Sequence, residues 1–114
     1  MNNTLAKIRK AREFSREIKG WKLKLRRPTD AEATVMFKAN EISHLDVAKK
    51  FVIGWEGVTE DKIVSGGSSD AVEFDADLWA EVVVDQPGIW DELTNSILES
   101  YLLYRKGKED REKQ

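Results

Sequence analysis

The segment WKLKLRRPTDAE, residues 21–32, carries signals for a strand, a break and a helix start in close succession. Apolar and basic residues alternate along WKLKLR, which is the period-2 pattern of a half-buried strand. Pro28 then ends the strand, because it has no amide hydrogen to offer a sheet. Thr29 and Glu32 have the spacing of a capping box, in which each side chain accepts the backbone amide of the other. This stretch predicts a strand followed closely by a helix.

The residues before this segment have the pattern of a basic amphipathic helix. Apolar residues recur at helical spacing, and Lys and Arg cover the other faces. The apolar positions are Leu5, Ile8, Ala11, Phe14 and Ile18. We expect a basic helical arm over residues 1–20, with its helix over roughly residues 4–18 and Gly20 as its C-cap. A free helix of this length is only marginally stable in water, so its apolar stripe should dock on the same chain or on a second copy.

Shorter elements are expected in the middle of the chain. Ser43 can cap a short helix, and the run FVIGW at residues 51–55 has the composition of a strand. Residues 61–64 can pair with that strand, and the glycine-serine run at 66–69 fits a flexible turn. Asp75 has the place of an N-cap before a further helix.

The last helix should bury one stripe of its surface. The stripe consists of Ile89, Leu93, Ile97, Tyr101 and Tyr104, with Trp90 beside it. We expect this helix to give way to a charged tail at residues 106–114, and residues 21–105 to form a single domain. A few strands with helices before and after them predict an α+β fold with a small antiparallel sheet and several helices.

The formal net charge of −2 conceals a strong asymmetry along the chain. Residues 1–27 carry ten Lys or Arg and two Glu, a net +8, whereas residues 28–104 carry four Lys and sixteen Asp or Glu, a net −12. A basic segment of this kind can bind nucleic acid. The simpler interpretation is that it lies against acidic groups of its own fold or of a neighbouring copy.

The sequence offers few residues for catalysis or metal binding. It has no cysteine and one histidine, His44, which is better explained as a surface or cap residue because a catalytic histidine needs a nucleophile and an orienting partner. Zinc sites draw on several Cys or His ligands, and Asp75 and Asp77 are better explained as helix-start residues. The run at 66–69 lacks the Lys-Ser/Thr ending of a phosphate loop. We therefore expect no enzyme, no cofactor and no metal.

A cytoplasmic location fits the distribution of apolar residues. No apolar run approaches the roughly 20 residues that span a bilayer. The first residues also lack the uninterrupted apolar core of a secretion signal.

Several motifs resemble those of a known family. These are LRRPTDAEAT at residues 25–34, FVIGWEGVTED at 51–61 and the helix start at 72–79, followed by a terminal helix with aromatic residues and a charged tail. Together they resemble the small tail assembly chaperones of long-tailed bacteriophages and prophages. The resemblance covers residues 22–105 and is sharpest in the G-W-x-G-V run at 54–58. It does not include the basic N-terminal segment.

The resemblance implies a non-enzymatic protein of the host bacterial cytoplasm. Such chaperones bind the tape measure protein and help tail-tube proteins to assemble around it. Because the tape measure protein is largely helical, the natural binding mode is an amphipathic helix in an apolar groove. Two alternatives stay open: a tail-completion or connector component of the virion, and a small nucleic-acid-binding regulator that uses the basic segment. A homo-oligomer is compatible with each of them.

A set of aromatic and acidic side chains is expected to contact a partner. Gly54 and Gly57 bracket Trp55, so the strand can bend while the indole stays buried between strand and helices. Glu60, Asp61 and the turn at residues 66–69 should form a mobile edge, and Trp90 should be partly exposed. The full set is Trp55, Glu56, Glu60, Asp61, Trp90 and Tyr101.

Overall fold

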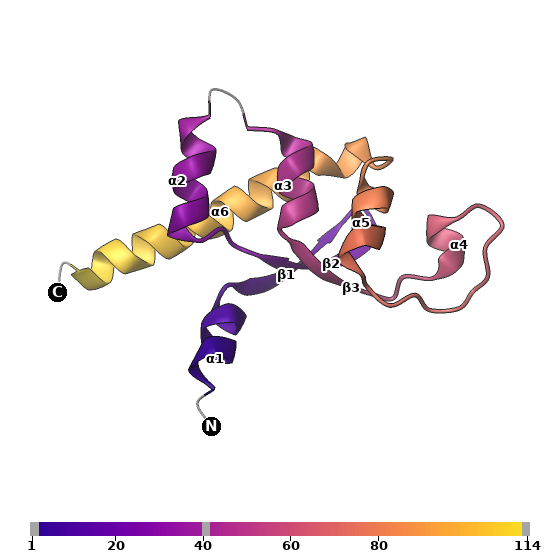
Figure 1. The fold of residues 1–114 in the computed structure, drawn as a ribbon, viewed down its shortest axis with the longest axis horizontal. Helices are drawn as coiled ribbons and strands as arrows, with labels where there is room; N and C mark the ends of the chain where they lie inside the picture. The colour runs from indigo at the N-terminus through magenta and orange to yellow at the C-terminus, as the bar shows by residue number, and fades with distance from the viewer. Residues whose placement is uncertain (1–2, 40–41, 113–114) are drawn as a thin grey trace.

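The computed structural model describes residues 3–39 and 42–112. Within these ranges the chain forms six helices and a three-stranded antiparallel sheet, which confirms the predicted α+β fold (Figure 1). The strands are β1 (Glu13–Ile18), β2 (Trp21–Arg26) and β3 (Val52–Glu56), in the order β1-β2-β3. The helices are α1 (Thr4–Ala11), α2 (Asp30–Lys38), α3 (His44–Lys50), α4 (Glu60–Ile63), α5 (Ala76–Val83) and α6 (Pro87–Glu112).

The central strand β2 behaves as its alternating sequence predicts. Trp21, Leu23 and Leu25 are buried, whereas the lysines between them are exposed. The buried face belongs to one hydrophobic core that also contains side chains of α3, α5 and α6. The sheet therefore has one face against helices and one face open to water.

The chain before β2 differs from the prediction. The helix ends at Ala11 and residues 13–18 form β1, so the predicted helix over 4–18 is wrong. Lys19 and Gly20 have φ angles of 47° and 87°, and a two-residue type I′ hairpin turn needs positive φ at both positions. The apolar spacing misled the prediction, because Phe14 and Ile18, four residues apart, share a face in a strand as well as in a helix.

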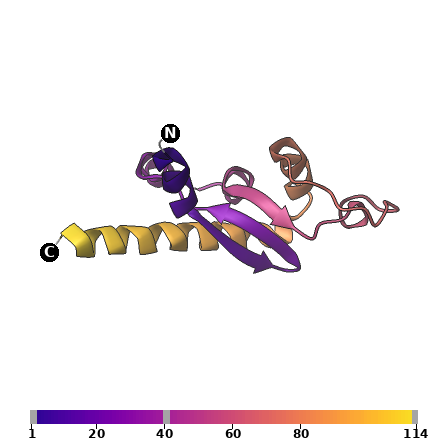
Figure 2. The same cartoon turned by 90° about the horizontal axis from the view of Figure 1, so that it is seen from below.

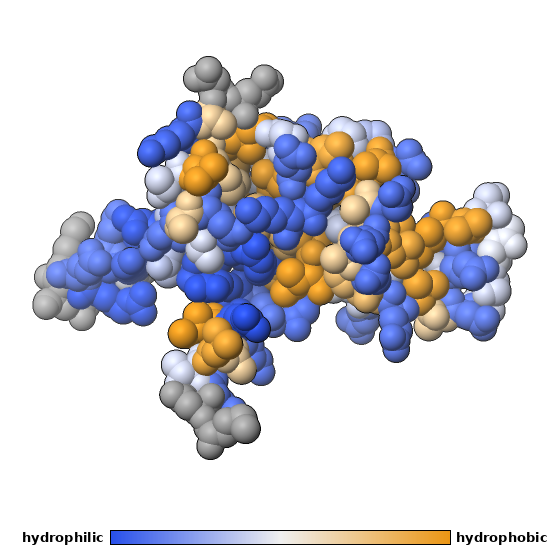
Figure 3. All heavy atoms as spheres, in the orientation of Figure 1, coloured by the Kyte–Doolittle hydropathy of each residue, from blue (hydrophilic) through white to orange (hydrophobic). Residues whose placement is uncertain are grey.

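Helix α1 buries none of its residues. Leu5 and Ile8 are 58% and 46% exposed, and the helix projects from the body in Figure 1. Figure 3 shows hydrophobic atoms beside strongly hydrophilic ones on this projection. The predicted docking of this stripe on the same chain is therefore wrong for α1, and docking on a second copy stays a prediction. Phe14 and Ile18, now part of β1, do contact the core.

Residues 61–64 do not pair with β3, which corrects a second prediction. They belong largely to α4, whose amides are bound by the loop that follows: Asp61 N donates to Ser68 O at 2.8 Å, and Glu60 N to Asp70 O at 3.0 Å. Gly67 passes so close to this helix that an added Cβ would lie 2.9 Å from the backbone of Glu60. The amides of Glu60 and Asp61 therefore donate to carbonyl oxygens of the loop and not to a neighbouring strand.

Helix α6 continues through the residues predicted to be a charged tail. It runs from Pro87 to Glu112, and Figure 2 shows its C-terminal end extending beyond the strands. The predicted stripe faces the core, with Ile89, Leu93, Ile97 and Tyr101 buried. No helix in the described part of the chain is long and apolar enough to cross a membrane.

The predicted helix starts are confirmed. Thr29 and Glu32 form both hydrogen bonds of the capping box, and Ser43 and Asp75 accept the amides of Asp46 and Leu78.

The tryptophans define the centre of the core. Trp79 is fully buried and donates its Nε1–H to Ala48 O at 2.9 Å, with the ring of Trp21 edge-on at 5.9 Å between centroids. Trp55 is only partly buried, which corrects its predicted position between strand and helices. Its strand, β3, lies at the edge of the sheet, which leaves one side of the ring partly open to water. The ring packs edge-on against Phe74, 5.2 Å between centroids, and its Nε1–H donates to Val72 O at 2.8 Å.

Replacing Trp79 by alanine should therefore destabilise the protein more than replacing Trp55. We expect Trp79→Ala to lower the free energy of unfolding by about 3–5 kcal/mol. Trp55→Ala should cost less, because part of its ring already contacts water. Urea unfolding followed by circular dichroism measures both. Equal losses, or a larger loss for Trp55→Ala, would contradict the central position of Trp79.

Candidate functional site

The acidic residues predicted to contact a partner lie on β3 and α4. Glu56 is exposed at the end of β3. Glu60 and Asp61 are also exposed, but they bind their own loop: Glu60 Oε1 accepts the amide of Ser68 at 3.0 Å, and Asp61 accepts the hydroxyl of Thr59. These contacts order the segment that the sequence suggested was a mobile edge.

The aromatic members of the predicted set lie elsewhere. Trp55 is part of the aromatic cluster with Trp21 and Trp79. Trp90 is partly exposed at the start of α6, as predicted, and donates to Val83 O at 2.7 Å. Tyr101 is buried farther along the same helix. Each of these aromatic side chains is engaged within the chain.

A groove of about 490 Å³ lies between the start of the β1–β2 hairpin and the C-terminal half of α6. One group of lining residues is apolar or aromatic, and a second group consists of arginines. The first group is Ala11, Phe14, Leu103 and Tyr104; the second is Arg12, Arg16, Arg27 and Arg111; Glu13 and Ser100 complete the lining. We call this surface the arginine groove.

Other hollows have a different character. One of about 520 Å³ over the sheet is lined by acidic Glu17 and Glu56 as well as by Arg16, Lys22 and Lys24, so opposite charges are mixed. A hollow of about 270 Å³ adjoins the arginine groove and shares Arg12 and Glu13 with it. The arginine groove combines apolar and aromatic walls with four arginines.

The hairpin register places two of the arginines side by side. Glu13 pairs with Arg26 at the open end of the hairpin. One step farther, the backbone N–H of Arg27 donates to the carbonyl oxygen of Arg12 at 2.9 Å. The amide of Arg12 caps α1 at the same time. Backbone hydrogen bonds therefore fix the residue at which the arm, the sheet and the groove meet.

The other wall, α6, is attached to α2 through Asp30. The hydroxyl of Tyr101 donates to Asp30 Oδ1 at 2.8 Å. The hydroxyl of Tyr104 and the ammonium of Lys108 both donate to Oδ2, each at 3.2 Å. The hydrogen bonds from Tyr101 and Lys108 lower the pKa of Asp30 to about 2. Through Lys108, this cluster also binds the part of α6 that lies beyond residue 105, the predicted end of the domain.

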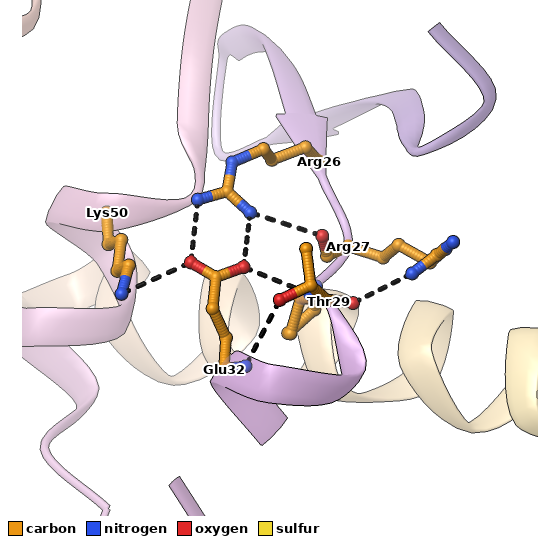
Figure 4. Close-up of polar contacts among 6 residues, drawn as sticks. Arg26, Arg27, Thr29, Glu32 and Lys50 are labelled. Atoms are coloured by element: carbon orange, nitrogen blue, oxygen red, sulfur yellow. Dashed lines mark hydrogen bonds and ion pairs between the residues drawn. The ribbon is translucent and has the colours of Figure 1, made fainter. Parts of the chain in front are cut away.

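A second carboxylate joins β2, α2 and α3. Glu32 accepts two hydrogen bonds from Arg26, at 2.7 and 2.9 Å, and its Oε2 lies 3.1 Å from Nζ of Lys50 (Figure 4). The guanidinium of Arg26 also lies over the ring of Phe51, 4.7 Å from its centroid. The hydrogen bond from Arg26 is the main reason why the pKa of Glu32 is lowered to about 2.

Arg27 belongs to the groove and not to this cluster. Its side chain points away from Glu32 in Figure 4 and donates to Pro28 O at 2.9 Å. The guanidinium lies over the ring of Tyr104, 3.4 Å from its centroid, so a residue after β2 contacts α6 directly. Burial lowers the pKa of Arg27, and the neighbouring positive charge of Arg12 lowers it further.

These residues suit the binding of a partner. The groove offers apolar area and guanidinium donors, and its lining contains no histidine or cysteine. His44 pairs with Asp91 on exposed surface. In residues 3–39 and 42–112 no group of three or more His, Asp or Glu side chains could hold a metal ion.

The importance of Glu32 can be tested through the pH dependence of stability. Its folded pKa of about 2 lies below its ordinary value of 4.5, so its stabilising contribution is present above pH 4.5 and is lost as the pH falls towards 2. We expect Glu32→Gln to lower the free energy of unfolding at pH 7 by about 1 kcal/mol, because the pair is partly exposed to solvent. Glutamine can still accept the amide of Thr29.

The measurement is urea unfolding of both proteins at several pH values. The difference between wild type and Glu32→Gln should shrink as the solution is acidified, since protonation removes the same charge from the wild type. A difference that stays constant down to the acid limit would mean that the charge of Glu32 does not stabilise the fold.

Comparison with known proteins adds no further constraint on this site. No protein-family model, no curated protein and no solved structure matches the chain.

Proposed function

We propose that this protein is a tail assembly chaperone of a long-tailed bacteriophage or prophage, and that it acts in the cytoplasm of the host. Its main partner is the tape measure protein, and the tail-tube protein is a second partner in the assembly. The motifs at residues 25–34 and 51–61 motivate the family. The observation that supports a client-binding role is the apolar lining of the arginine groove.

The walls of the groove offer apolar area that the fold does not use. Leu103 lines the groove and is 61% exposed, as is its neighbour Leu102 on α6. Full burial of a leucine side chain contributes about 1.5–3 kcal/mol. Single exposed leucines are ordinary, whereas contiguous exposed apolar area is typical of interaction sites, and Leu103 adjoins the apolar lining of the groove. An amphipathic helix can bury them in the same way as other helix-in-groove complexes do.

Helix α1 adds a second apolar surface at the same end of the molecule. Ala11, at its end, lines the groove, while Leu5 and Ile8 remain exposed farther out. A client helix in the groove would lie next to this arm and cover part of it. The arm thus extends the surface available for holding a long helical protein, and it is equally available for pairing with a second copy.

Co-expression with a fragment of the tape measure protein tests this role. The tape measure gene is expected as a very long gene close to the one encoding this protein. We expect the two products to co-purify and the fragment to become more soluble. Leu103→Glu should weaken the complex about tenfold or more, because it places a charge where the client's apolar side chains are buried.

Val64→Glu is the matched control. Val64 is 55% exposed, close to the 61% of Leu103, but it follows α4 and does not line the groove. It should leave the complex intact. A client fragment that neither co-purifies nor gains solubility would refute the proposed function; equal weakening by both variants would place the client elsewhere on the surface.

A further inference from the structure

The lining of the arginine groove has an excess of positive charge. It is lined by four arginines and one acidic residue, Glu13. Glu13 is already paired with Lys24, whose Nζ lies 3.0 Å from Oε1. In the part of the chain that the structure describes, none of the four arginines forms an ion pair with a carboxylate.

Arg12 has a buried donor with no acceptor. Its Nε is inaccessible to solvent and has no hydrogen-bond partner among residues 3–39 and 42–112. A buried guanidinium donor without an acceptor is unfavourable, and most buried polar atoms in proteins are paired. Arg12 lines the groove, and its other guanidinium nitrogens are the donors that an oxygen atom of a ligand can reach.

Arg27 is held in an orientation that suits an anion. Its plane is fixed over the ring of Tyr104, 3.4 Å from the centroid, and one nitrogen donates to Pro28 O. The hydrogen bond between the backbones of Arg27 and Arg12 keeps the two residues adjacent. Two neighbouring guanidinium groups repel each other, and a carboxylate bound between them would relieve this repulsion through charge-assisted hydrogen bonds.

The walls around this charge distinguish between kinds of anion. Phe14, Leu103 and Tyr104 offer apolar area next to the guanidinium groups. A nucleic-acid strand would extend beyond the groove onto a body with a net charge of −12, which repels its phosphates. A protein helix with an apolar face and acidic residues at its border matches both features.

We propose that Arg12 and Arg27, with Arg16 and Arg111 at the border, form a carboxylate-binding site, and that the client of the groove is an acidic amphipathic helix. This inference rests on the proposed function for the nature of the client. It adds the feature by which the client is selected: an Asp or Glu beside the apolar residues that enter the groove.

A pair of synthetic helical peptides tests the selection. The two peptides have the same leucine face; one carries glutamate along the border of that face, and the other carries glutamine at the same positions. Fluorescence anisotropy with the full chain should show about tenfold tighter binding of the glutamate peptide at low salt. This preference should largely disappear at about 0.5 M salt, because exposed charges are then screened.

Three variants locate the effect in the groove. Arg12→Gln should remove most of the preference for the glutamate peptide. Arg111→Gln, at an exposed position in the last turn of α6, should reduce it without disturbing the fold, which keeps the test valid if Arg12→Gln is unstable. Lys10→Gln removes the same charge from α1 but does not line the groove, and it should bind like the wild type.

The outcomes separate this inference from the proposed function. Equal affinity for both peptides, or no binding of either, overturns the carboxylate site even if the tape measure fragment still co-purifies. Selective binding of the glutamate peptide without any tape measure complex supports the site and refutes the proposed client. A single-stranded oligonucleotide that binds more tightly than the peptide, and that is weakened equally by Lys10→Gln and Arg12→Gln, overturns the inference in favour of nucleic acid.

Discussion

The pairing of β1 with β2 is the constraint on which the other parts of the molecule depend. The Lys19–Gly20 turn fixes the register of this pair. Side chains alternate between the faces of a strand, so a slip of one residue would turn Trp21, Leu23 and Leu25 towards water. The same register carries Arg12 to the side of Arg27 at the open end of the hairpin. Core and groove are thus two consequences of one short turn.

Helix α2 connects this hairpin to the rest of the fold through two carboxylates in its first turn. Asp30 binds side chains of α6, and Glu32 binds Arg26 of β2 and Lys50 of α3. Because the two carboxylates lie two residues apart on a helix, they point in different directions. A nine-residue helix that buries only Ala33 can therefore hold three elements in place by polar contacts.

Local signals in the sequence were sufficient for much of the fold and insufficient for the site. The capping box at Thr29 and the alternation along β2 depend on neighbouring residues, and both were predicted correctly. The extension of α6 was missed because it depends on Asp30, which is far away in sequence. The arginine groove was missed for the same reason: its members run from Ala11 to Arg111, and strand pairing and helix packing bring them together. The one available signal was the unusually basic composition up to Arg27.

A single residue joins the arm to the sheet. Arg12 lies between the end of α1 and the start of β1, and its amide and carbonyl are both hydrogen-bonded to the backbone. The direction of α1 is therefore set by main-chain atoms, whereas its side chains take no part in the core. The position of α1 therefore does not depend on which side chains it carries. We expect residues 4–11 to diverge freely between related chains, so that one scaffold can be adapted to different clients without being rebuilt.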